Sequence, residues 1–266
     1  LEKTFESKKP IIAMVHFPPT PGSPEYDAEG GVERIYKSVR KDAIALTRNG
    51  VNNVMFCNEG DRPYLKDVGF ETPTTMAAVI SRVVNELDIN HFGTDVLWDP
   101  EAALALGKAT GANFVREVFT GLFAGDIGSW DTDPGESVRY QNAIDADELK
   151  LLFNINAEFA SSLDARSLEM IAKSVKFSSI PDILCVSGGM TGMETGVEKL
   201  RSVKKAVGDN TPVFANTGVT IDNIEDILSV ADGVVIGSHL KVDGDTWNPV
   251  DPERVDRFMN KVESLR

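Results

Sequence analysis

The chain has 266 residues, a length typical of one closed α/β barrel, and its 42% hydrophobic and 26% charged residues suit a globular protein with a sizeable core. Its 41 acidic and 27 basic residues give a net charge of −14, which argues against nucleic acid or an anionic lipid surface as a partner. No apolar run reaches membrane-spanning length and no signal-peptide pattern precedes the first predicted strand, so we expect a cytoplasmic protein without stable membrane insertion.

Short apolar runs alternate with helical patterns along the whole chain. The predicted strands cover residues 11–17, 53–57, 91–98, 113–118, 150–155, 182–186, 213–215 and 234–236. The predicted helices cover residues 32–47, 72–87, 100–110, 134 onward, 167–176, 197–207, 222–231 and 252–265. This alternation predicts a single α/β domain over residues 1–266, folded as a (β/α)8 TIM barrel. An open doubly wound sheet is the alternative, although the first strand lacks the GxGxxG turn of that fold.

Residues 18–31 form an unusually long connection between the first strand and the first long helix. The segment is rich in proline and glycine, which excludes a helix or a central strand. A connection of this length is uncommon in βα units and is often functional. We therefore predict a long loop on the C-terminal face of the barrel, as a lid or an interface arm.

Several helix starts carry a capping signal. Thr72, Asp99 and Asp133 each precede a proline, the residue that suits the first helical position. Asp222 and Glu225 have the spacing of a capping box. We therefore interpret Asp99 and Asp133 as structural caps rather than as catalytic acids.

The chain has two cysteines, Cys57 and Cys185, and both lie in predicted strands. We expect them to be reduced and buried, with no disulfide framework. The sequence shows no His/Cys spacing typical of a metal site, so no metal and no cofactor are predicted. A magnesium ion held by carboxylates and a phosphate stays open as an alternative.

Glycine-containing turns follow the last two predicted strands. The first turn includes Asn216 and Gly218, and the second includes Gly237 and Ser238. In TIM barrels the loops after strands seven and eight frequently bind phosphate, because backbone N–H groups can approach the ligand there. The pair of turns predicts a site for phosphate or another anion. The structural alternative is that these are ordinary turns between a strand and the next helix, where glycine is common.

Five polar residues near predicted strand ends are the catalytic candidates. His16, with a reference pKa near neutrality, Glu59 and Glu117 are the candidates for general acid–base chemistry. Arg116 and Glu117 interrupt an apolar strand, so one of them should face the barrel interior and the other the helix layer. An interior charge must be paired or bind a ligand, and a structural Arg–carboxylate bridge is the alternative. Asn154 and Arg116 are candidates to hold a carbonyl or hydroxyl group.

Four further residues are predicted to face a ligand from neighbouring loops. They are Asp126, in a glycine turn after the fourth predicted strand, and Asn156, Ser187 and Gly188, which follow the fifth and sixth. Lys150 lies at the start of a strand, on the opposite face of a barrel, which disfavours a Schiff-base aldolase.

Several short sequence segments together resemble a known family. FVREVFTG, KLLFNINAE, CVSGGMTG, ANTGVT, ADGVVIGSHLK and NPVDPERV resemble the BtpA/SgcQ family over most of the chain, from about His16 to Arg257. The resemblance implies a TIM barrel close to the ribulose-phosphate-binding barrels. It also implies one branch linked to photosystem I biogenesis at the membrane and another linked to carbohydrate gene clusters. The Arg116-Glu117-Val118 strand and the run from Asn154 to Phe159 look more like the SgcQ branch.

Two functions remain open at this point. The first is an enzyme that acts on a small phosphorylated sugar or related metabolite, by isomerase, epimerase or aldolase-type chemistry. The second is a non-catalytic assembly or scaffold protein of the BtpA type, for photosystem or membrane-complex biogenesis. The paired glycine turns favour the enzyme, and a homo-oligomer is compatible with either.

Overall fold

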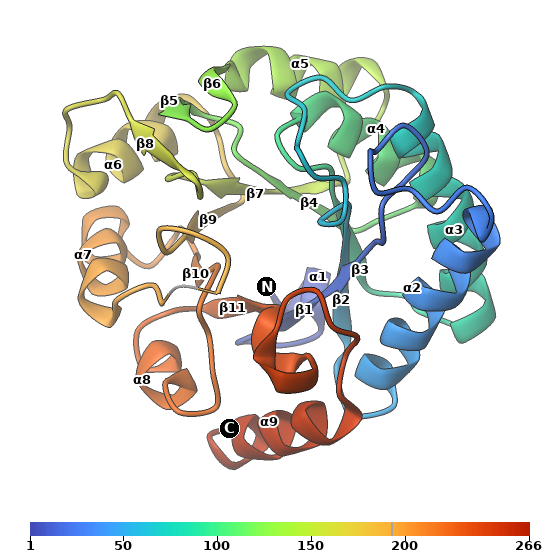
Figure 1. Cartoon of the computed structure of the whole chain (residues 1–266). Coiled ribbons are helices and arrows are strands. Elements are labelled where there is room, and N and C mark those ends of the chain that lie inside the picture. The colour runs from blue at the N-terminus through green and yellow to red at the C-terminus, as the bar shows by residue number, and fades with distance from the viewer. Residues whose placement is uncertain (193) are drawn as a thin grey trace.

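A closed parallel barrel forms the centre of the computed structural model, which describes residues 1–192 and 194–266 (Figure 1). Its strands are β1 (Ile11–His16), β2 (Asn53–Cys57), β3 (Phe92–Asp95), β4 (Phe114–Glu117), β7 (Lys150–Asn154), β9 (Ile183–Val186), β10 (Val213–Ala215) and β11 (Gly233–Ile236). These strands pair in parallel in chain order, and β11 pairs with β1. This closure confirms the predicted (β/α)8 TIM barrel and excludes the open sheet.

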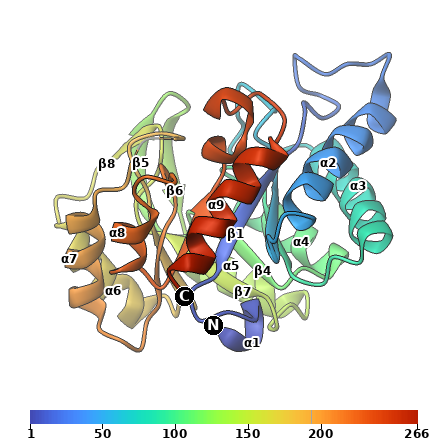
Figure 2. The ribbon, with the colours of Figure 1, turned by 90° about the horizontal axis from the view of Figure 1, so that it is seen from below.

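Helices surround the barrel in a ring, as the end-on and side views show (Figures 1 and 2). They are α2 (Gly31–Thr47), α3 (Glu71–Leu87), α4 (Pro100–Thr110), α5 (Pro134–Ala143), α6 (Leu168–Ser178), α7 (Val197–Val207), α8 (Ile224–Leu228) and α9 (Pro252–Ser264). Two short 3₁₀ turns, η1 (Ser238–Leu240) and η2 (Val242–Gly244), follow β11. In the described part of the chain, no helix is both long enough and apolar enough to cross a membrane.

The predicted caps are correct for two helices and wrong for two others. Asp99 accepts a hydrogen bond from the Ala102 N–H at the start of α4, and Asp133 caps α5 in the same way. Thr72 lies inside α3 instead of capping it. The capping box at Asp222 is also wrong: α8 begins at Ile224, after a turn held by Asn223, and ends at Leu228. Polar residues capable of capping also stabilise turns, so spacing alone did not distinguish the two roles.

The lower half of the barrel interior is apolar. Alternate strand residues point inward, and they include Ile12, Met14, Met55, Cys57, Phe114, Leu152, Ile183, Cys185, Phe214 and Val235. The short N-terminal helix α1 (Glu2–Phe5) places Phe5 against Phe114 and Phe214, with ring centroids 5.1 and 6.0 Å apart. A Cβ atom on Gly93 would lie 2.1 Å from the Phe114 ring, so only glycine leaves room for this packing.

Inward positions become polar toward the C-terminal ends of the strands. The period of two leads from Met14 to His16 and from Cys57 to Glu59. It likewise leads from Phe114 to Arg116. On three other strands, the residue two positions after an inward-facing residue is also polar and buried, and these residues are Asp95, Asn154 and Asn216. The strand pattern therefore builds an apolar plug below a layer of buried polar side chains.

A small antiparallel sheet stands outside the barrel at its C-terminal end. It consists of β5 (Gly121–Gly125), β6 (Gly128–Thr132) and β8 (Ala160–Ser162), in the order β6-β5-β8. The sequence analysis placed no strands in these segments. The glycine-flanked pair Asp126-Ile127 forms the turn between β5 and β6, a pattern compatible with a two-residue hairpin.

The loop between β1 and α2 lies at the C-terminal end of the barrel, as predicted. Its Thr20 is fully buried, and the Thr20 N–H donates to Asp61 Oδ1 over 2.6 Å. The Thr20 and Thr72 hydroxyl oxygens lie 3.0 Å apart. The base of this loop is therefore fastened to the segment that connects β2 with α3, and the role as a lid or interface arm stays a prediction.

Both cysteines are free and fully buried inside the barrel, as expected. Burial raises the pKa of the Cys57 thiol well above its ordinary value and that of Cys185 to about 12, because a thiolate is poorly solvated there. We predict that neither thiol reacts with the aryl disulfide dithiobis(nitrobenzoic acid) in the native protein, and that both react in denaturant. Rapid native labelling of either cysteine would contradict the packing described.

Candidate functional site

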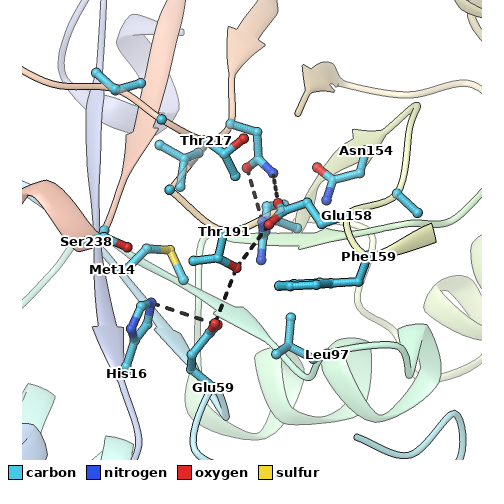
Figure 3. A pocket seen from close by; sticks show the side chains of 18 of the residues that line it. Met14, His16, Glu59, Leu97, Asn154, Glu158, Phe159, Thr191, Thr217 and Ser238 are labelled. Atoms are coloured by element: carbon cyan, nitrogen blue, oxygen red, sulfur yellow. Dashed lines mark hydrogen bonds and ion pairs between the residues drawn. The ribbon is translucent and has the colours of Figure 1, made fainter. Parts of the chain in front are cut away.

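A cavity of about 210 Å³ opens at the C-terminal ends of the barrel strands. The buried polar layer forms its floor, and the loops after the strands form its walls (Figure 3). Lining residues that the sequence analysis selected are His16, Glu59, Arg116, Glu117, Asn154, Asn216, Gly218, Gly237 and Ser238. This position is where TIM-barrel enzymes place their active sites.

Two carboxylic acids, Glu59 and Glu158, are linked across the cavity by Thr191. The Thr191 hydroxyl lies 3.4 Å from Glu59 Oε1 and 3.1 Å from Glu158 Oε2 (Figure 3). A hydroxyl has one proton, so it can donate to one carboxylate while accepting from the other acid when that acid is protonated. The three side chains thus form a path along which a proton can be shared.

Burial raises the pKa of both acids. The pKa of Glu158 rises to about 7 because its charged form loses solvation, although Arg116 partly offsets this effect. Burial also raises the pKa of Glu59, and the nearby Asp95 adds to the shift. Glu158 therefore exists in both protonation states near neutral pH, which is the property required of a general acid–base group.

His16 stands beside this pair at the end of β1. Its Nε2 atom lies 4.0 Å from Glu59 Oε2. Burial lowers the pKa of His16 well below its ordinary value, and the positive charge of Lys241 lowers it further. Lys241 is itself buried and pairs with Asp42 of α2 at 3.5 Å. The imidazole is therefore neutral at physiological pH and can both donate and accept a proton.

Arg116 faces the barrel interior and forms the Arg–carboxylate bridge that was the structural alternative to a catalytic role. It makes an ion pair with Asp95, which is completely buried, and its Nη1 donates to Asn216 Oδ1 over 3.1 Å. The Asn216 Nδ2 donates in turn to Ser187 Oγ over 2.8 Å. The internal ion pair is therefore present, and because the same side chain also lines the cavity, the catalytic role of Arg116 stays a prediction.

Four buried polar atoms at the site lack a hydrogen-bond partner among the described residues. They are the oxygens Asn154 Oδ1 and Asp95 Oδ1 and the nitrogens His16 Nδ1 and Arg116 Nε. A buried oxygen without a donor costs about 1–3 kcal/mol, so native proteins usually satisfy it. Asn154 lines the cavity, where a ligand hydroxyl can provide the donor.

Glu117 does not point into the helix layer, contrary to the alternation argument. Its Oε1 accepts the Trp98 N–H over 2.8 Å, and its Oε2 accepts the Val118 N–H. The side chain thus folds over the end of β4, where the regular pleat no longer fixes its direction. Both carboxylate oxygens are occupied by backbone donors, so Glu117 holds the adjoining loops together.

The two turns of the predicted anion site lie side by side. The Ile221 N–H, after the β10 turn, donates to His239 Nε2, after the β11 turn, over 3.2 Å. Gly218 has a φ of 67°, a conformation that favours glycine. A Cβ atom on Gly237 would lie 3.3 Å from Met14 and 3.5 Å from the His16 ring. Both turns therefore adjoin the acid–base groups, and anion binding there stays a prediction.

The other predicted ligand-facing residues lie outside the cavity lining. Asp126 is exposed at the tip of the β5–β6 hairpin, because this segment forms a sheet instead of a loop folded over the barrel. Asn156 bonds the Ser187 backbone in both directions, each over 2.9 Å. The Gly188 N–H donates to Thr217 Oγ1 over 2.6 Å. Asn156, Ser187 and Gly188 thus hold the loops that carry the lining residues.

An aromatic wall closes one side of the cavity. Trp98, Val118, Phe123, Trp130 and Ala157 form a buried apolar cluster, and the partly buried Phe159 packs against it. The Trp98 and Trp130 ring centroids are 4.3 Å apart. Trp130 comes from β6, so the small antiparallel sheet contributes to this wall directly.

Sequence reasoning missed several residues of the site. Glu158, Thr191, Trp98 and Phe159 were not selected, and Lys241 was not recognised as a buried lysine after β11. Glu158 carried a usable signal, since it follows the Asn154 strand end closely. Thr191 carried none, because its contacts depend on the path of the loop after β9. Within residues 1–192 and 194–266, no group of three or more His, Cys, Asp or Glu side chains is placed to hold a metal.

Comparison with solved structures gives the fold class. Thiamine phosphate pyrophosphorylase from Pyrococcus furiosus superposes with a TM-score of 0.57 at 15% identity, covering 97% of this chain and 96% of that one. Phosphoribosyl anthranilate isomerase from Thermus thermophilus superposes with a TM-score of 0.57 at 12% identity, covering 97% of this chain and 100% of that one. At such low identity these likenesses establish a shared barrel fold and nothing about the reaction.

Sequence comparison gives the family. The sgc region protein SgcQ of Escherichia coli K12 is 45% identical over 266 residues, covering 100% of this chain and 98% of the relative. The photosystem I biogenesis protein BtpA of Synechocystis is 30% identical over 265 residues, covering 98% of this chain and 91% of the relative. The BtpA family model matches residues 7–264. The chain therefore belongs to the BtpA family, with higher identity to SgcQ than to the photosystem protein.

Proposed function

We propose that the chain is an enzyme that moves a proton on a small phosphorylated sugar or related metabolite, in an isomerase, epimerase or aldolase type of reaction. The observation that carries the proposal is the Glu59–Thr191–Glu158 path at the C-terminal end of the barrel. Two acids with raised pKa values that share a hydroxyl are arranged as an acid–base pair. The solved barrels that superpose on this chain include enzymes named for phosphorylated compounds, so other proteins with this fold accommodate such ligands.

The groups suit abstraction of a proton from a carbon next to a carbonyl. In the proposal, ionised Glu158 takes the proton from carbon while protonated Glu59 gives one to the carbonyl oxygen, which produces an enediol. Return of a proton from Glu158 to either carbon, and loss of the hydroxyl proton to Glu59, completes the reaction and restores both acids. Arg116 and Asn154 lie where they can hold the oxygens of the substrate. Positioned groups of this kind typically contribute about 10²–10⁴-fold each to a rate.

A phosphate on the N–H groups around Gly218 and Gly237 would hold the substrate against these acids. Because the chain is strongly acidic overall, backbone donors are a means of binding an anion without adding formal charge. The scaffold alternative requires no such cavity. The unpaired Asn154 oxygen and the shifted pKa values favour a ligand over a surface used only for assembly.

Gly237→Val tests the anion site. The added side chain would meet Met14 and the His16 ring and would restrict the turn, so we expect at least tenfold weaker binding of a phosphorylated ligand. The fold should persist, since the position is at a strand end. A thermal-shift screen of sugar phosphates identifies a stabilising compound, and calorimetry then compares its affinity for the parent and the variant.

Gly196→Val is the matched control for this experiment. Gly196 precedes α7 with a φ of −58°, and a Cβ atom there meets no other atom within 4 Å. The control should bind the sugar phosphate as the parent does. Equal affinity in folded Gly237→Val would remove the phosphate site, and absence of stabilisation by every sugar phosphate would favour the scaffold function.

A further inference from the structure

We propose that the cavity binds its ligand as a closed sugar ring, with the apolar face of the ring stacked on a platform formed by Trp98 and Phe159. The inference rests on the proposed function and specifies its substrate class: a hexose phosphate that binds as its closed ring and opens in the cavity. On opening, the anomeric hydroxyl proton passes to the ring oxygen and the bond between the anomeric carbon and the ring oxygen breaks, which forms the carbonyl that the proposed proton transfer requires. Trp98 and Phe159 both line the cavity, on the wall formed by the aromatic cluster.

Both platform residues have a backbone conformation that bulky side chains rarely adopt. Trp98 has a φ of 71° and Phe159 a φ of 56°, both in the left-handed region. This conformation is strained for a residue with a Cβ atom, and strain of this kind is often found at ligand-binding sites. A glycine would relieve the strain at either position but would remove the ring.

Specific contacts maintain the strained conformations. The Trp98 N–H donates to the buried Glu117 carboxylate over 2.8 Å, and the Phe159 N–H donates to the Gly189 carbonyl over 3.1 Å. The Trp98 side chain is further braced by Trp130, whose ring centroid is 4.3 Å away. The backbone at both platform positions is therefore held by hydrogen bonds, and the Trp98 ring is packed against Trp130, which lowers the conformational entropy that Trp98 loses on binding.

The polar groups on the same cavity suit a ligand with hydroxyls, since a hydroxyl can both donate and accept a hydrogen bond. Glu158 directly precedes Phe159, and Asn154 lies close by on β7, so hydrogen-bonding groups flank the ring of Phe159 (Figure 3). The unpaired Asn154 oxygen needs a donor, which a hydroxyl supplies and a carbonyl or phosphate does not. A flat aromatic ligand would satisfy the platform but leave these groups unpaired.

A closed sugar ring satisfies both requirements at once. Its equatorial hydroxyls point outward in the plane of the ring, and its axial C–H groups form an apolar face that packs on an aromatic ring. An open chain presents the same hydroxyls without a continuous apolar face. The platform should therefore distinguish the two forms even when carbon skeleton and phosphate are the same.

The test compares ring-locked and open-chain probes by calorimetry. The ring-locked probes are the anhydrohexitol 6-phosphates of gluco, manno and galacto configuration, and the open-chain probes are the corresponding hexitol 6-phosphates. We expect at least one ring-locked probe to bind about tenfold more tightly than its open-chain counterpart. That preference should fall to about twofold in Trp98→Leu and in Phe159→Leu.

Two features of the design keep the outcome clear. Phe159 is only partly buried, so Phe159→Leu tests the platform even if Trp98→Leu unfolds. Trp247→Leu is the control, because Trp247 is 51% exposed and its ring stacks on Arg62 instead of lining the cavity. The control should keep the preference for the ring.

Three results would overturn the inference. Equal binding of ring-locked and open-chain probes would overturn it while leaving the proposed phosphorylated substrate in place. The same holds for a ring preference that survives in both platform variants. If no probe of either kind binds, the ring inference and the hexose phosphate as ligand both fail.

Discussion

Replacing Arg116 with methionine is expected to lower the free energy of unfolding by about 3–5 kcal/mol, because the change leaves the Asp95 carboxylate without its partner inside the barrel. Asp95 is fully buried, and Arg116 provides its ion pair. A buried ion pair stabilises little relative to an apolar pair, but removal of one partner leaves a desolvated charge. Urea denaturation followed by circular dichroism measures the loss.

Two further variants establish the cause of that loss. Arg116→Met with Asp95→Asn removes both charges, and we expect it to recover most of the stability. Arg201→Met breaks an exposed pair with Glu198 at 3.4 Å, which should cost less than about 1 kcal/mol. A loss below 1 kcal/mol for Arg116→Met itself would show that the internal bridge does not hold the barrel together.

The second large effect concerns Glu158 and the pH dependence of stability. Its pKa in the folded protein is about 7, compared with an ordinary value of 4.5. Between these values the folded state holds a proton that the unfolded state has released, so stability falls as pH rises through this window. Glu158→Gln removes the titrating group. The variant should therefore gain stability over the parent from pH 4.5 to 7, and the difference should level off above the folded pKa.

The expected gain at pH 8 is about 1–3 kcal/mol, since each pH unit of the window contributes at most about 1.4 kcal/mol and the side chain is only partly buried. Denaturation of both proteins at several pH values gives the difference. Glu198→Gln provides the control, because Glu198 is 86% exposed and its substitution should give a flat difference. A flat difference for Glu158→Gln would mean that Glu158 ionises as an ordinary surface acid.

The barrel could be predicted because each strand can be recognised from its own apolar residues and the turns beside it. Apolar runs such as 11–16 and 233–236 are separated by glycine turns and amphipathic helices, and each unit repeats the same pattern. Local rules also predicted that one of Arg116 and Glu117 faces the interior, but the structure was needed to show that it is Arg116, two residues after the inward-facing Phe114. Fold class and the general position of the site therefore depend on short-range information.

The composition of the site depends on contacts that local rules do not contain. Thr191 meets Glu59 and Glu158 only because the loop after β9 crosses the cavity in one particular way. Glu117 left the direction predicted by the pleat because two backbone N–H groups at the strand end attract its carboxylate. Loop paths and strand-end hydrogen bonds are set by the whole fold, so a single sequence did not reveal them.

The cavity is lined partly by the barrel and partly by the small β5–β6–β8 sheet, which are two separate sheets. The barrel strands and the segments directly after them supply the titratable groups, whereas β6 supplies Trp130. The sheet pairs with none of the barrel strands, so its sequence is free of the register constraints that fix the barrel. Substitutions on β6 therefore change the surface beside Trp98 without replacing any residue of the barrel strands.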